Sequence, residues 1–475
     1  MQILTVKLLQ KTEANVEYRE IIARLDAALG VGRSFDVTKR EFSAARGSAQ
    51  ASFYSVAGLC DGEAAEKMIR FAVLADSPKT CMDSLPHPDV MLTDDIAALT
   101  SAVISGRGVL AVEGADKAAV IDIKSYPLRS VDEPENDKVL RGPRDGFGES
   151  LVRNTALIRR RLRDPKLITE KFTVGDPAQC DVVMCYVDGK APDKLVSALR
   201  KKLSSLKTEA LNMSQQSLAE CLIKTGWYNP FPKVRYTERP DTATACVMEG
   251  DVLLLIDNTP AVMIFPVSIL RFAEEINDYY FPPLVGSYLR IVRLVVLFLT
   301  IFVTPLWYLL VKSPDTLHEN LHFLLIEGEC PVPLILQLLL VELIIDVLKL
   351  ASLNTPDVLG NSFSMLGALI LGDFAVQSRW LVPEVLVYMA FVAIANFTQH
   401  SFEMSYACKL CRMALLVMIW LFDWWGFALG IVGILVLIAT TKPLVGRGYL
   451  YPLIPYDGKK LRALLHRRPI SRENT

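Results

Sequence analysis

The C-terminal part of this 475-residue chain contains apolar runs that are too long for an ordinary soluble core. The first, IVRLVVLFLTIFVTPLWYLLV, covers 291–311. About 20 apolar residues form a helix of ~30 Å, which is the thickness of a bilayer's hydrocarbon core. Two further candidates are 332–350 and 381–397, and a fourth run covers 413–440. We therefore expect an α-helical transmembrane domain of about four crossings over 286–442.

The number of crossings depends on two segments. The run 362–377 is marginal in length and polarity, and we expect it to be buried or re-entrant. The run 413–440 is too long for one simple span, and its tryptophans cluster around Asp423. Because tryptophan favours the membrane interface, this run is either a broken helix or a tight hairpin. Five or six crossings are the alternatives to four.

The basic residues predict the orientation of the domain. Arg290 and Arg293 lie next to the first span, and the tail 443–475 is basic, whereas the loop 312–331 is acidic. Cytoplasmic loops of membrane proteins carry the excess of lysine and arginine. We therefore expect both termini inside and 312–331 outside, which requires an even number of crossings. The first residues lack the apolar core of a secretory signal, so we expect the N-terminus in the cytoplasm.

The first 285 residues alternate charged and apolar stretches as globular domains do, and they repeat a pattern. FYSVAGLCDGEAAEKMIR (53–70) and VMCYVDGKAPDKLVSALR (183–200) each predict a strand, a turn and an amphipathic helix. Later, 103–123 and 247–265 each predict two strands joined by a turn. The fold class that we expect is an N-terminal α/β cytosolic region of two related modules, followed by the transmembrane domain.

The predicted modules have the following bounds. A helical segment covers 1–29, the first module covers 30–138, and the second covers 165–285. Between the modules, 139–164 forms a linker and a basic helix. Its glycines do not fit a nucleotide site, because the Walker lysine–hydroxyl pair and the Gly-x-Gly-x-x-Gly spacing are both missing.

The basic helix has an apolar stripe at helical spacing. This stripe consists of Phe147, Leu151, Thr155, Ile158 and Leu162. We expect the arginines to lie away from it, namely Arg153, Arg159, Arg160, Arg161 and Arg163. They form either a solvated basic face or an electrostatic contact with anionic lipid headgroups or an acidic neighbouring subunit. Nucleic acid is not expected as a partner, because no aromatic residues are interleaved and the net charge is −1.

Several long motifs resemble one protein family. RGPRDGF (141–147) with Glu149 and NTALIRRRLRDP (154–165) resembles the signature of the spore germinant receptor A-subunit family, the GerA family. The likeness continues through YNPFPKVRYTERPD (228–241), GDVLLLIDNTPAVMIFP (250–266) and the membrane half. LGVGRSFDVTKRE, at 29–41, resembles one sporulation branch most closely. Asp145 stands where many A subunits carry glutamate.

The resemblance implies a location and partners. Family members lie in the inner membrane of the bacterial spore, as multi-pass proteins whose N-terminal region faces the core. The resemblance also implies a homo-oligomer, a small membrane partner protein or other receptor subunits, and a channel for monovalent cations. The signature segment then becomes an assembly or coupling element. Its candidate residues are Arg141, Gly142, Pro143, Arg144, Asp145, Phe147, Glu149, Asn154, Arg159, Arg160 and Arg161.

Charged residues inside the apolar runs are candidates for an ion path. Glu342 and Asp346 share one helix face, with Lys349 one turn further on, and Asp373 lies in the marginal run. Exposure of an acidic residue to lipid costs about 2.5–3.5 kcal/mol at mid-membrane, so these carboxylates must find partners or water. They form either a buried network, in which Asp346 pairs with Lys349, or a ring of carboxylates in an oligomeric pore.

No catalytic constellation is evident, and we expect no enzyme activity, cofactor or metal. The nine cysteines show no disulfide framework, and the pair Cys408 and Cys411 lacks a second ligand pair for zinc. We therefore expect a membrane subunit of a spore germination complex that forms an ion channel with membrane lipid around it. The alternatives are a nutrient-sensing receptor subunit that acts as a scaffold and a secondary transporter.

Overall fold

The computed structural model shows two compact units, each described here by itself. Unit 1 contains 1–224, 234–266 and 444–446, and unit 2 contains 225–233, 267–443 and 447–475. The residues that the structure describes are 18–127, 141–176, 179–206, 214–223, 226–275, 277–316, 318–326, 331–354, 376–399, 401–441, 443–444 and 448–466.

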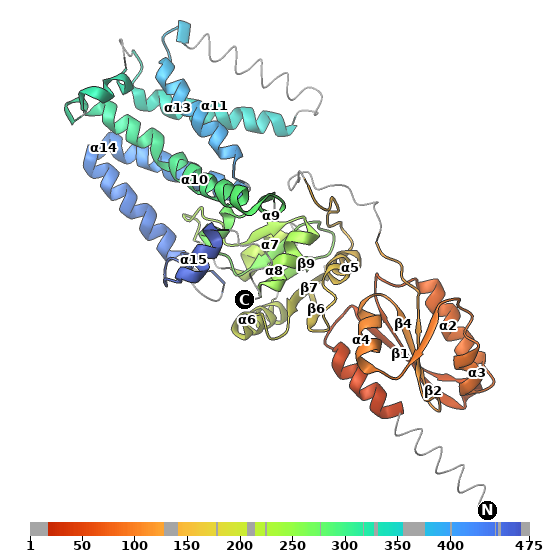
Figure 1. Ribbon diagram of the computed structural model, residues 1–475. Coiled ribbons are helices and arrows are strands. Elements are labelled where there is room, and N and C mark those ends of the chain that lie inside the picture. The colour runs from red at the N-terminus through yellow and green to blue at the C-terminus, as the bar shows by residue number, and fades with distance from the viewer. Residues whose placement is uncertain are drawn as a thin grey trace, which may run out of the picture. The chain divides into compact units, whose positions relative to one another are not determined.

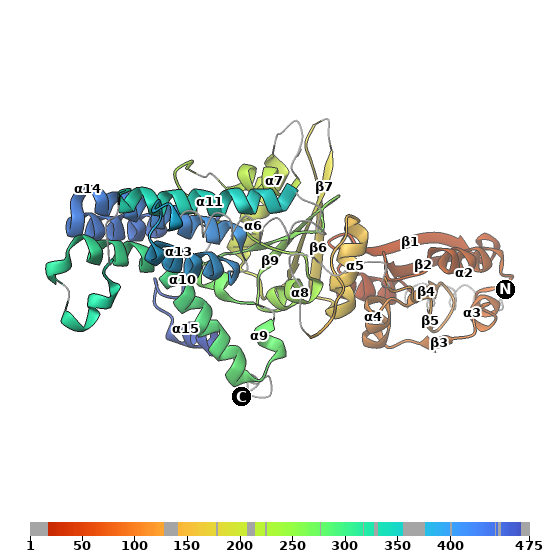
Figure 2. The ribbon, with the colours of Figure 1, turned by 90° about the horizontal axis from the view of Figure 1, so that it is seen from above.

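The first module of unit 1 is a five-stranded antiparallel sheet in the order β1-β2-β4-β5-β3, which Figure 2 shows from above. Residues 18–29 and α4 cover one face, while α2 and α3 cover the other. The strands are β1 (Val37–Ala44), β2 (Ala49–Val56), β3 (Val90–Thr93), β4 (Gly108–Val112) and β5 (Ala118–Ile121). The helices are α2 (Gly62–Leu74), α3 (Pro78–Asp83) and α4 (Ile96–Ile104).

The second module repeats this topology. Its antiparallel sheet has the order β6-β7-β9-β10-β8, which is the order of the first sheet in sequence terms. The strands are β6 (Leu167–Val174), β7 (Cys180–Val187), β8 (Arg235–Thr237), β9 (Val252–Ile256) and β10 (Val262–Phe265). The helices are α5 (Leu151–Arg161), α6 (Asp193–Ser205), α7 (Ser214–Leu222) and α8 (Pro240–Met248). The predicted strand-turn-helix and two-strand segments are thus confirmed in both halves.

Alternation along the strands creates two cores in each module. In β9, Leu254 faces α6 and α7, whereas Leu253 and Leu255 face α5 and α8. Successive side chains of a strand point to opposite faces, so each sheet is buried on both sides. Helix α5 therefore belongs to a layer of the second module and is not a separate linker helix. The helix at 18–29 has the same place before β1 of the first module.

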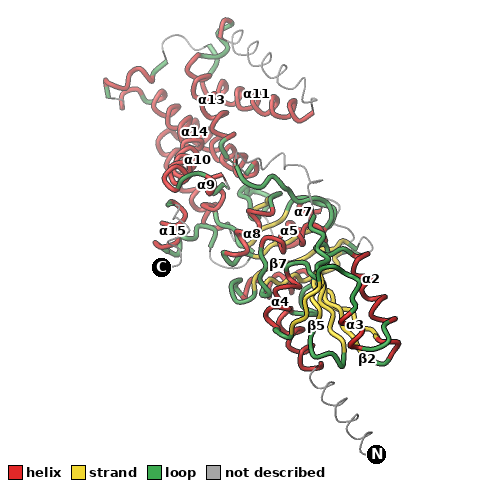
Figure 3. The backbone as a smooth tube through the Cα atoms, turned by 45° about the vertical axis from the view of Figure 1, so that its right-hand side comes forward, coloured by secondary structure: helices red, strands yellow, loops and turns green. Residues whose placement is uncertain are grey.

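The secondary structure that the described residues of unit 2 form is helical, with loops between the helices, as the red and green tube of Figure 3 shows. Two of its helices, α10 and α14, are long and apolar enough to cross a membrane, and α13 is a shorter apolar helix. The α-helices of this unit are α9 (Asn277–Tyr280), α10 (Pro283–Lys312), α11 (Leu334–Asn354), α13 (Pro383–Phe397), α14 (Phe402–Thr440) and α15 (Gly458–Leu465) (Figure 1). Short 3-10 segments are η2 (Ile269–Ala273), η3 (Pro314–Thr316) and η4 (Glu319–Leu324).

Helix α14 folds back on itself at Asp423, whose backbone has φ 52° and ψ −129°. A Cβ atom added to Gly426 would lie 1.9 Å from the carbonyl oxygen of Met418, and one added to Gly430 would lie 2.5 Å from the Leu415 side chain. Residues eight or more apart cannot approach so closely along one straight helix, since each residue rises 1.5 Å. Of the two predicted forms, α14 therefore takes the tight hairpin.

The helix directions follow from contacts at one end of the bundle. The end of α10 meets the hairpin tip, because Lys312 forms an ion pair with Asp423. The starts of α11 and α13 meet where the backbone N–H of Val382 donates to Gln337 at 2.9 Å. Helices α11 and α13 thus run in the same direction. The marginal run 362–377 lies outside the described residues except at 376–377.

Candidate functional site

The signature segment at 141–161 is attached to the second module through its backbone. Arg239, whose side chain is fully buried, donates from Nη2 to the carbonyl of Pro143 at 2.7 Å. The N–H of Phe147 donates to the carbonyl of Glu238 at 2.8 Å, and the Phe147 ring enters the core beside α5. Because both contacts come from residues 238 and 239, between β8 and α8, the segment has a fixed path before α5 begins.

Asn154 and Asp145 hold the glycine-rich turn against α5. The Asn154 amide accepts from the N–H of Gly148 at 2.9 Å and donates to the Gly148 carbonyl at 2.6 Å. Asp145 pairs with Arg161 at 2.5 Å, and the backbone of Glu149 accepts from Asn258 at 2.9 Å. Six of the predicted coupling residues thus have contacts within the second module, namely Pro143, Asp145, Phe147, Glu149, Asn154 and Arg161. Arg141, Gly142 and Arg144 are exposed, and Arg159 and Arg160 have contacts of their own.

Arg159 contradicts the sequence prediction. We expected it on a basic outer face, but its exposed fraction is 1 %. Its guanidinium binds both carboxylate oxygens of Asp36, at 2.7 and 3.0 Å. Thr169 donates to Asp36 at 2.6 Å, and Arg159 also donates to the Leu167 carbonyl at 2.9 Å. This network joins the first module to β6 and α5.

The prediction failed because α5 is buried on two sides. Leu157 and Ile158 pack into the second module, whereas Ala156 packs into the core of the first. A Cβ added to Gly58 would lie 2.9 Å from the Ala156 Cβ, so the first module approaches α5 at a glycine. A single apolar stripe shows only one of these faces. The second face consists of small residues and the paired arginine.

The electrostatics of this network favour the charged pair. Burial alone lowers the pKa of the Arg159 guanidinium, but the Asp36 carboxylate outweighs burial, and the pKa of Arg159 is raised above its ordinary value. Arg160 stacks on Tyr126, with 5.0 Å from its guanidinium carbon to the ring centroid. The arginines of α5 therefore serve largely within unit 1.

A second charged cluster lies between the apolar helices of unit 2. Glu342 on α11 is 1 % exposed and faces Arg412 on α14, with 2.5 Å between Nη2 and Oε1. Arg412 also donates to the Thr300 carbonyl of α10 at 2.7 Å. Lys409, one turn before Arg412, lies 2.5 Å from Asp346 and 3.3 Å from Glu342. Two acidic and two basic side chains thus join three helices.

The structure shows contacts for three of the four residues that we predicted as ion-path candidates, namely Glu342, Asp346 and Lys349. The buried-network alternative paired Asp346 with Lys349, but the ion pair of Asp346 in the structure is with Lys409, at 2.5 Å. Lys349 lies over the Tyr406 ring at 5.4 Å. Asp373 lies outside the described residues. Lys409 and Arg412 were missed, although their spacing of one helical turn complements that of Glu342 and Asp346.

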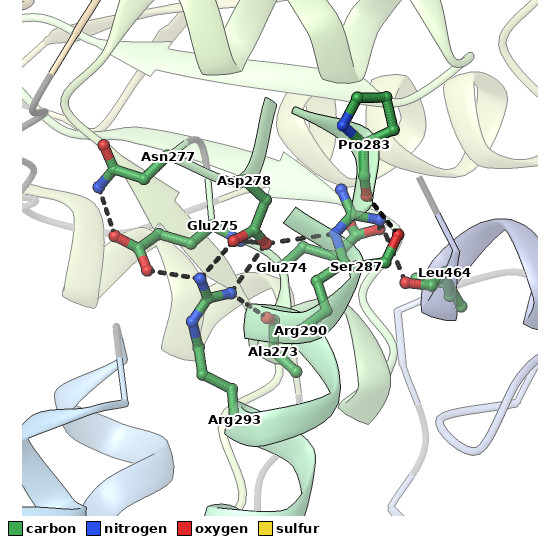
Figure 4. Close-up of polar contacts among 10 residues, drawn as sticks. All are labelled: Ala273, Glu274, Glu275, Asn277, Asp278, Pro283, Ser287, Arg290, Arg293 and Leu464. Carbon is green, nitrogen blue, oxygen red and sulfur yellow. Dashed lines mark hydrogen bonds and ion pairs between the residues drawn. The ribbon is translucent and has the colours of Figure 1, made fainter. Parts of the chain in front are cut away.

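A third cluster lies where α10 begins (Figure 4). We predicted that Arg290 and Arg293 flank the first span, but α10 begins at Pro283, so both lie inside the helix and are buried. Arg293 donates to Asp278 at 2.9 Å and to the Ala273 carbonyl at 2.8 Å, and Arg290 donates to Asp278 at 3.2 Å. Proline is favoured at the first helical position, which explains the earlier start. Asp278 pairs with both arginines and so fixes α9 to α10.

The comparison with protein families decides the identity of the chain. The family described as Bacillus/Clostridium GerA spore germination protein matches residues 24–475. The chain belongs to the GerA family. The resemblance in the signature motifs is thereby confirmed over nearly the whole length. The family comprises spore germination proteins, among them A subunits of germinant receptors.

Individual members of the GerA family agree with this assignment. Stage V sporulation protein AF of Bacillus subtilis (strain 168) is 35% identical over 447 residues, which cover 92% of this chain and 90% of that protein. This protein represents the sporulation branch of the family that the sequence at 29–41 resembles. Spore germination protein KA of the same organism is 28% identical and covers 81% of this chain and 71% of its own length.

A solved structure also resembles part of the chain. It is the N-terminal domain of the A subunit of the Bacillus megaterium spore germinant receptor GerK3, which covers 51% of this chain and 92% of its own. The TM-score is 0.38 and the sequence identity is 22%.

Proposed function

We propose that this GerA-family chain is a membrane subunit of a spore germination complex and that its copies assemble into a channel for monovalent cations. The observation that carries the proposal is the cluster of Glu342, Asp346, Lys409 and Arg412 between apolar helices. A plain membrane anchor has no need to bury four charges. In a helical bundle that transports ions, such residues face the interior or a water-filled path.

Within the cluster, the two carboxylates differ in their contacts. Glu342 is almost fully buried and engaged by both cations. Asp346 has a side chain that is 29% exposed, and its Oδ1 has no hydrogen-bond partner among the described residues. Glu342 therefore holds the helices together, and Asp346, whose side chain is the more exposed of the two, is the carboxylate that we assign to the ion path. One such carboxylate per chain becomes a ring when the chain oligomerises.

In this proposal the helices of unit 2 cross the inner membrane of the spore, with both termini on the core side. Helices α11 and α13 run in the same direction, and α14 is a hairpin whose tip meets the end of α10. The described segments that cross are α10, α11, α13 and the two legs of α14. The aromatic residues Trp380, Trp420 and Trp425 are exposed, as expected of residues at a membrane interface.

Cation flux tests the channel. The full chain, reconstituted with the membrane protein that co-purifies with it, is assayed for potassium and chloride permeability. We expect Asp346→Asn to lower the ratio of potassium to chloride permeability several-fold, because it removes one carboxylate from each chain of the ring. Glu319→Gln is the matched control, since Glu319 lies exposed in η4. Its permeability ratio remains that of the unchanged chain.

The same assay can contradict the proposal. If the reconstituted chain passes no cations with its partner present, the chain is not a channel, and the charged cluster serves assembly alone. That outcome favours the alternative of a nutrient-sensing receptor subunit that acts as a scaffold. If Asp346→Asn and Glu319→Gln behave alike, the ion path does not include Asp346.

A further inference from the structure

Segments from two distant parts of the sequence pack together in unit 2. They are the loop 226–233 and, near the end of the chain, the loop 448–457 with helix α15, which directly follows it. The Tyr449 hydroxyl donates to the Pro232 carbonyl at 2.9 Å. The Tyr449 ring packs against the Phe231 ring, with 6.4 Å between the ring centroids. The Asn229 amide donates to Thr441, just after α14, at 2.7 Å. These contacts fix the segments where the apolar hairpin ends.

Helix α15 is attached at the first turns of α10. The Arg290 guanidinium donates to the carbonyl of Leu464 at 3.1 Å, as Figure 4 shows. Leu464 and Leu465 line a small cavity together with Leu294 of α10. The apolar side of α15 is thus turned toward α10. Its charged side carries Lys459, Lys460 and Arg462, which are exposed.

Large aromatic and aliphatic side chains are exposed on the two loops. The exposed fraction is 97% for Trp227, 66% for Tyr228, 64% for Ile454 and 77% for Tyr456. Large apolar side chains exposed on two loops that pack against each other indicate an interaction surface. We name the set Trp227, Tyr228, Ile454, Tyr456, Lys459, Lys460 and Arg462 the basic–aromatic surface.

The surface adjoins a helix face suited to lipid. Exposed apolar residues on α10 recur at alternating steps of four and three, which keeps them on one side of the helix. They are Leu284, Tyr288, Ile291, Val295 and Phe298. This stripe begins in the part of α10 to which α15 is attached. A bilayer around α10 therefore meets the aromatic loops and the basic side of α15 at its edge.

We propose that the basic–aromatic surface binds anionic phospholipid headgroups in the leaflet that surrounds the start of α10. Lys459, Lys460 and Arg462 contact the phosphates, while Trp227, Tyr228 and Tyr456 lie at the level of the headgroups. Aromatic rings with one polar edge favour this level, and each basic residue near an anionic surface adds to the attraction. The inference rests on the membrane placement in the proposed function but not on ion conduction.

A lipid fits this surface better than a protein partner. The basic side chains share one helix, and the apolar ones come from separate loops, an arrangement that suits a layer of lipid headgroups and chains. The nearby carboxylate Asp457 accepts from the backbone of Lys460 at 3.1 Å and from the Tyr451 hydroxyl at 2.7 Å. It thus caps α15. The lysines and arginine of α15 therefore present positive charge outward.

Quenching of tryptophan fluorescence by brominated lipids tests the inference. The full chain is reconstituted in a reporter background in which four exposed tryptophans are changed to phenylalanine, so that Trp227 and the buried Trp307 remain. The changed residues are Trp380, Trp420, Trp424 and Trp425. Quenching is compared between brominated phosphatidylglycerol and brominated phosphatidylcholine. We expect phosphatidylglycerol to quench Trp227 at a several-fold lower mole fraction.

Removing the basic charges of α15 distinguishes lipid binding at this surface from a general attraction of basic residues to an anionic membrane. The variant Lys459→Gln, Lys460→Gln, Arg462→Gln is expected to lower the preference for phosphatidylglycerol at least about fivefold. The control removes three exposed lysines of unit 1, as Lys67→Gln, Lys194→Gln, Lys201→Gln, and leaves the preference unchanged. If the reporter background does not fold, native mass spectrometry of the same charge variants with their own tryptophans counts the bound phosphatidylglycerol.

The possible outcomes have distinct meanings. Equal quenching by both lipids would overturn the headgroup inference while leaving the membrane placement intact. An equal loss in both triple variants would also overturn it, because unit 1 charges would then account for the preference. Absence of quenching by either lipid would place Trp227 outside the bilayer. The channel proposal is judged separately by cation flux.

Discussion

The Arg159 guanidinium binds both carboxylate oxygens of Asp36, a residue 123 positions earlier in the chain. This pair is completely enclosed, with side chains that are 1% and 0% exposed. It joins the start of the first module's sheet to the helix that opens the second module. The signature segment of the GerA family is therefore part of the interface between the two modules of unit 1.

Removing one partner of this pair should destabilise unit 1 strongly. Asp36→Asn leaves a buried guanidinium without its counter-charge, which costs about 3–5 kcal/mol in comparable buried pairs. The urea concentration at which unit 1 loses its protease resistance in the full-length protein should therefore be lower for Asp36→Asn. Arg159→Lys should also weaken the pair, because lysine cannot bind both oxygens.

An exposed ion pair of the same unit provides the control for Asp36→Asn. Arg33 and Asp188 lie 3.2 Å apart, with side chains that are 58% and 47% exposed. Such a pair contributes little to stability, since water and salt screen it. Asp188→Asn should therefore leave the urea dependence almost unchanged. A similar shift for Asp36→Asn and Asp188→Asn would contradict the role given to the buried network.

The repeat and the strands were predictable from sequence because they follow local patterns. The short continuous apolar runs at 183–187 and 252–256, each followed by turn residues, predict strands that are buried on both faces. The place of Arg159 was not predictable in this way. Its partner lies in another module, and an arginine on a helix surface has the same local pattern whether it meets water or a buried carboxylate.

The charged cluster of unit 2 was also predictable only in part. Glu342 and Asp346 were identified because charges stand out within an apolar run. Lys409 and Arg412 lie just before the next apolar run, where basic residues are common, so they attracted no attention. Their spacing of three residues, like the spacing of four between the two carboxylates, nevertheless places both side chains on one face of a helix. Pairing acids and bases that lie about one helical turn apart on two candidate spans could have predicted the contact.

Arg412→Leu alone should destabilise the bundle, whereas the double change Glu342→Leu, Arg412→Leu should recover much of the loss. A single change leaves one buried charge without its main partner, whereas the double change leaves two apolar side chains. The thermal transition of the purified protein in detergent measures both. Equal destabilisation by the single and double changes would show that the pair does not interact as described.

Lowering the pH should decrease the folding stability of unit 1 through protonation of Glu170. Burial raises the pKa of this carboxyl, but Arg200 at 2.5 Å and the Tyr186 hydroxyl at 2.6 Å outweigh burial, and the pKa of Glu170 is lowered. A depressed folded-state pKa gives stability that is present above the unfolded pKa, about 4.3, and is lost as the pH falls through the folded value.

Glu170→Gln tests this sign. Hydrogen exchange of β6 and β7 measured from pH 6 to pH 3 should show less loss of protection below about pH 4.3 in the variant, since the neutral amide does not titrate. The variant should be less stable than the unchanged chain at pH 6, where the ionised carboxylate contributes. If both proteins lose protection in parallel over this range, another carboxyl governs the acid response.

The hairpin in α14 depends on glycine at one position of its second leg. Gly426→Ala places a Cβ atom 1.9 Å from the Met418 carbonyl oxygen, so the two legs must separate near the turn at Asp423. Gly433→Ala, on the same leg, meets nothing within 4 Å and is the matched control. Alanine is the better helix former, so Gly433→Ala should leave stability unchanged or raise it slightly. We expect Gly426→Ala to lower the thermal transition of the detergent-purified protein by several degrees and to decrease cation flux. Equal transitions for the two variants would mean that the legs do not pack as closely as Gly426 and Met418 indicate.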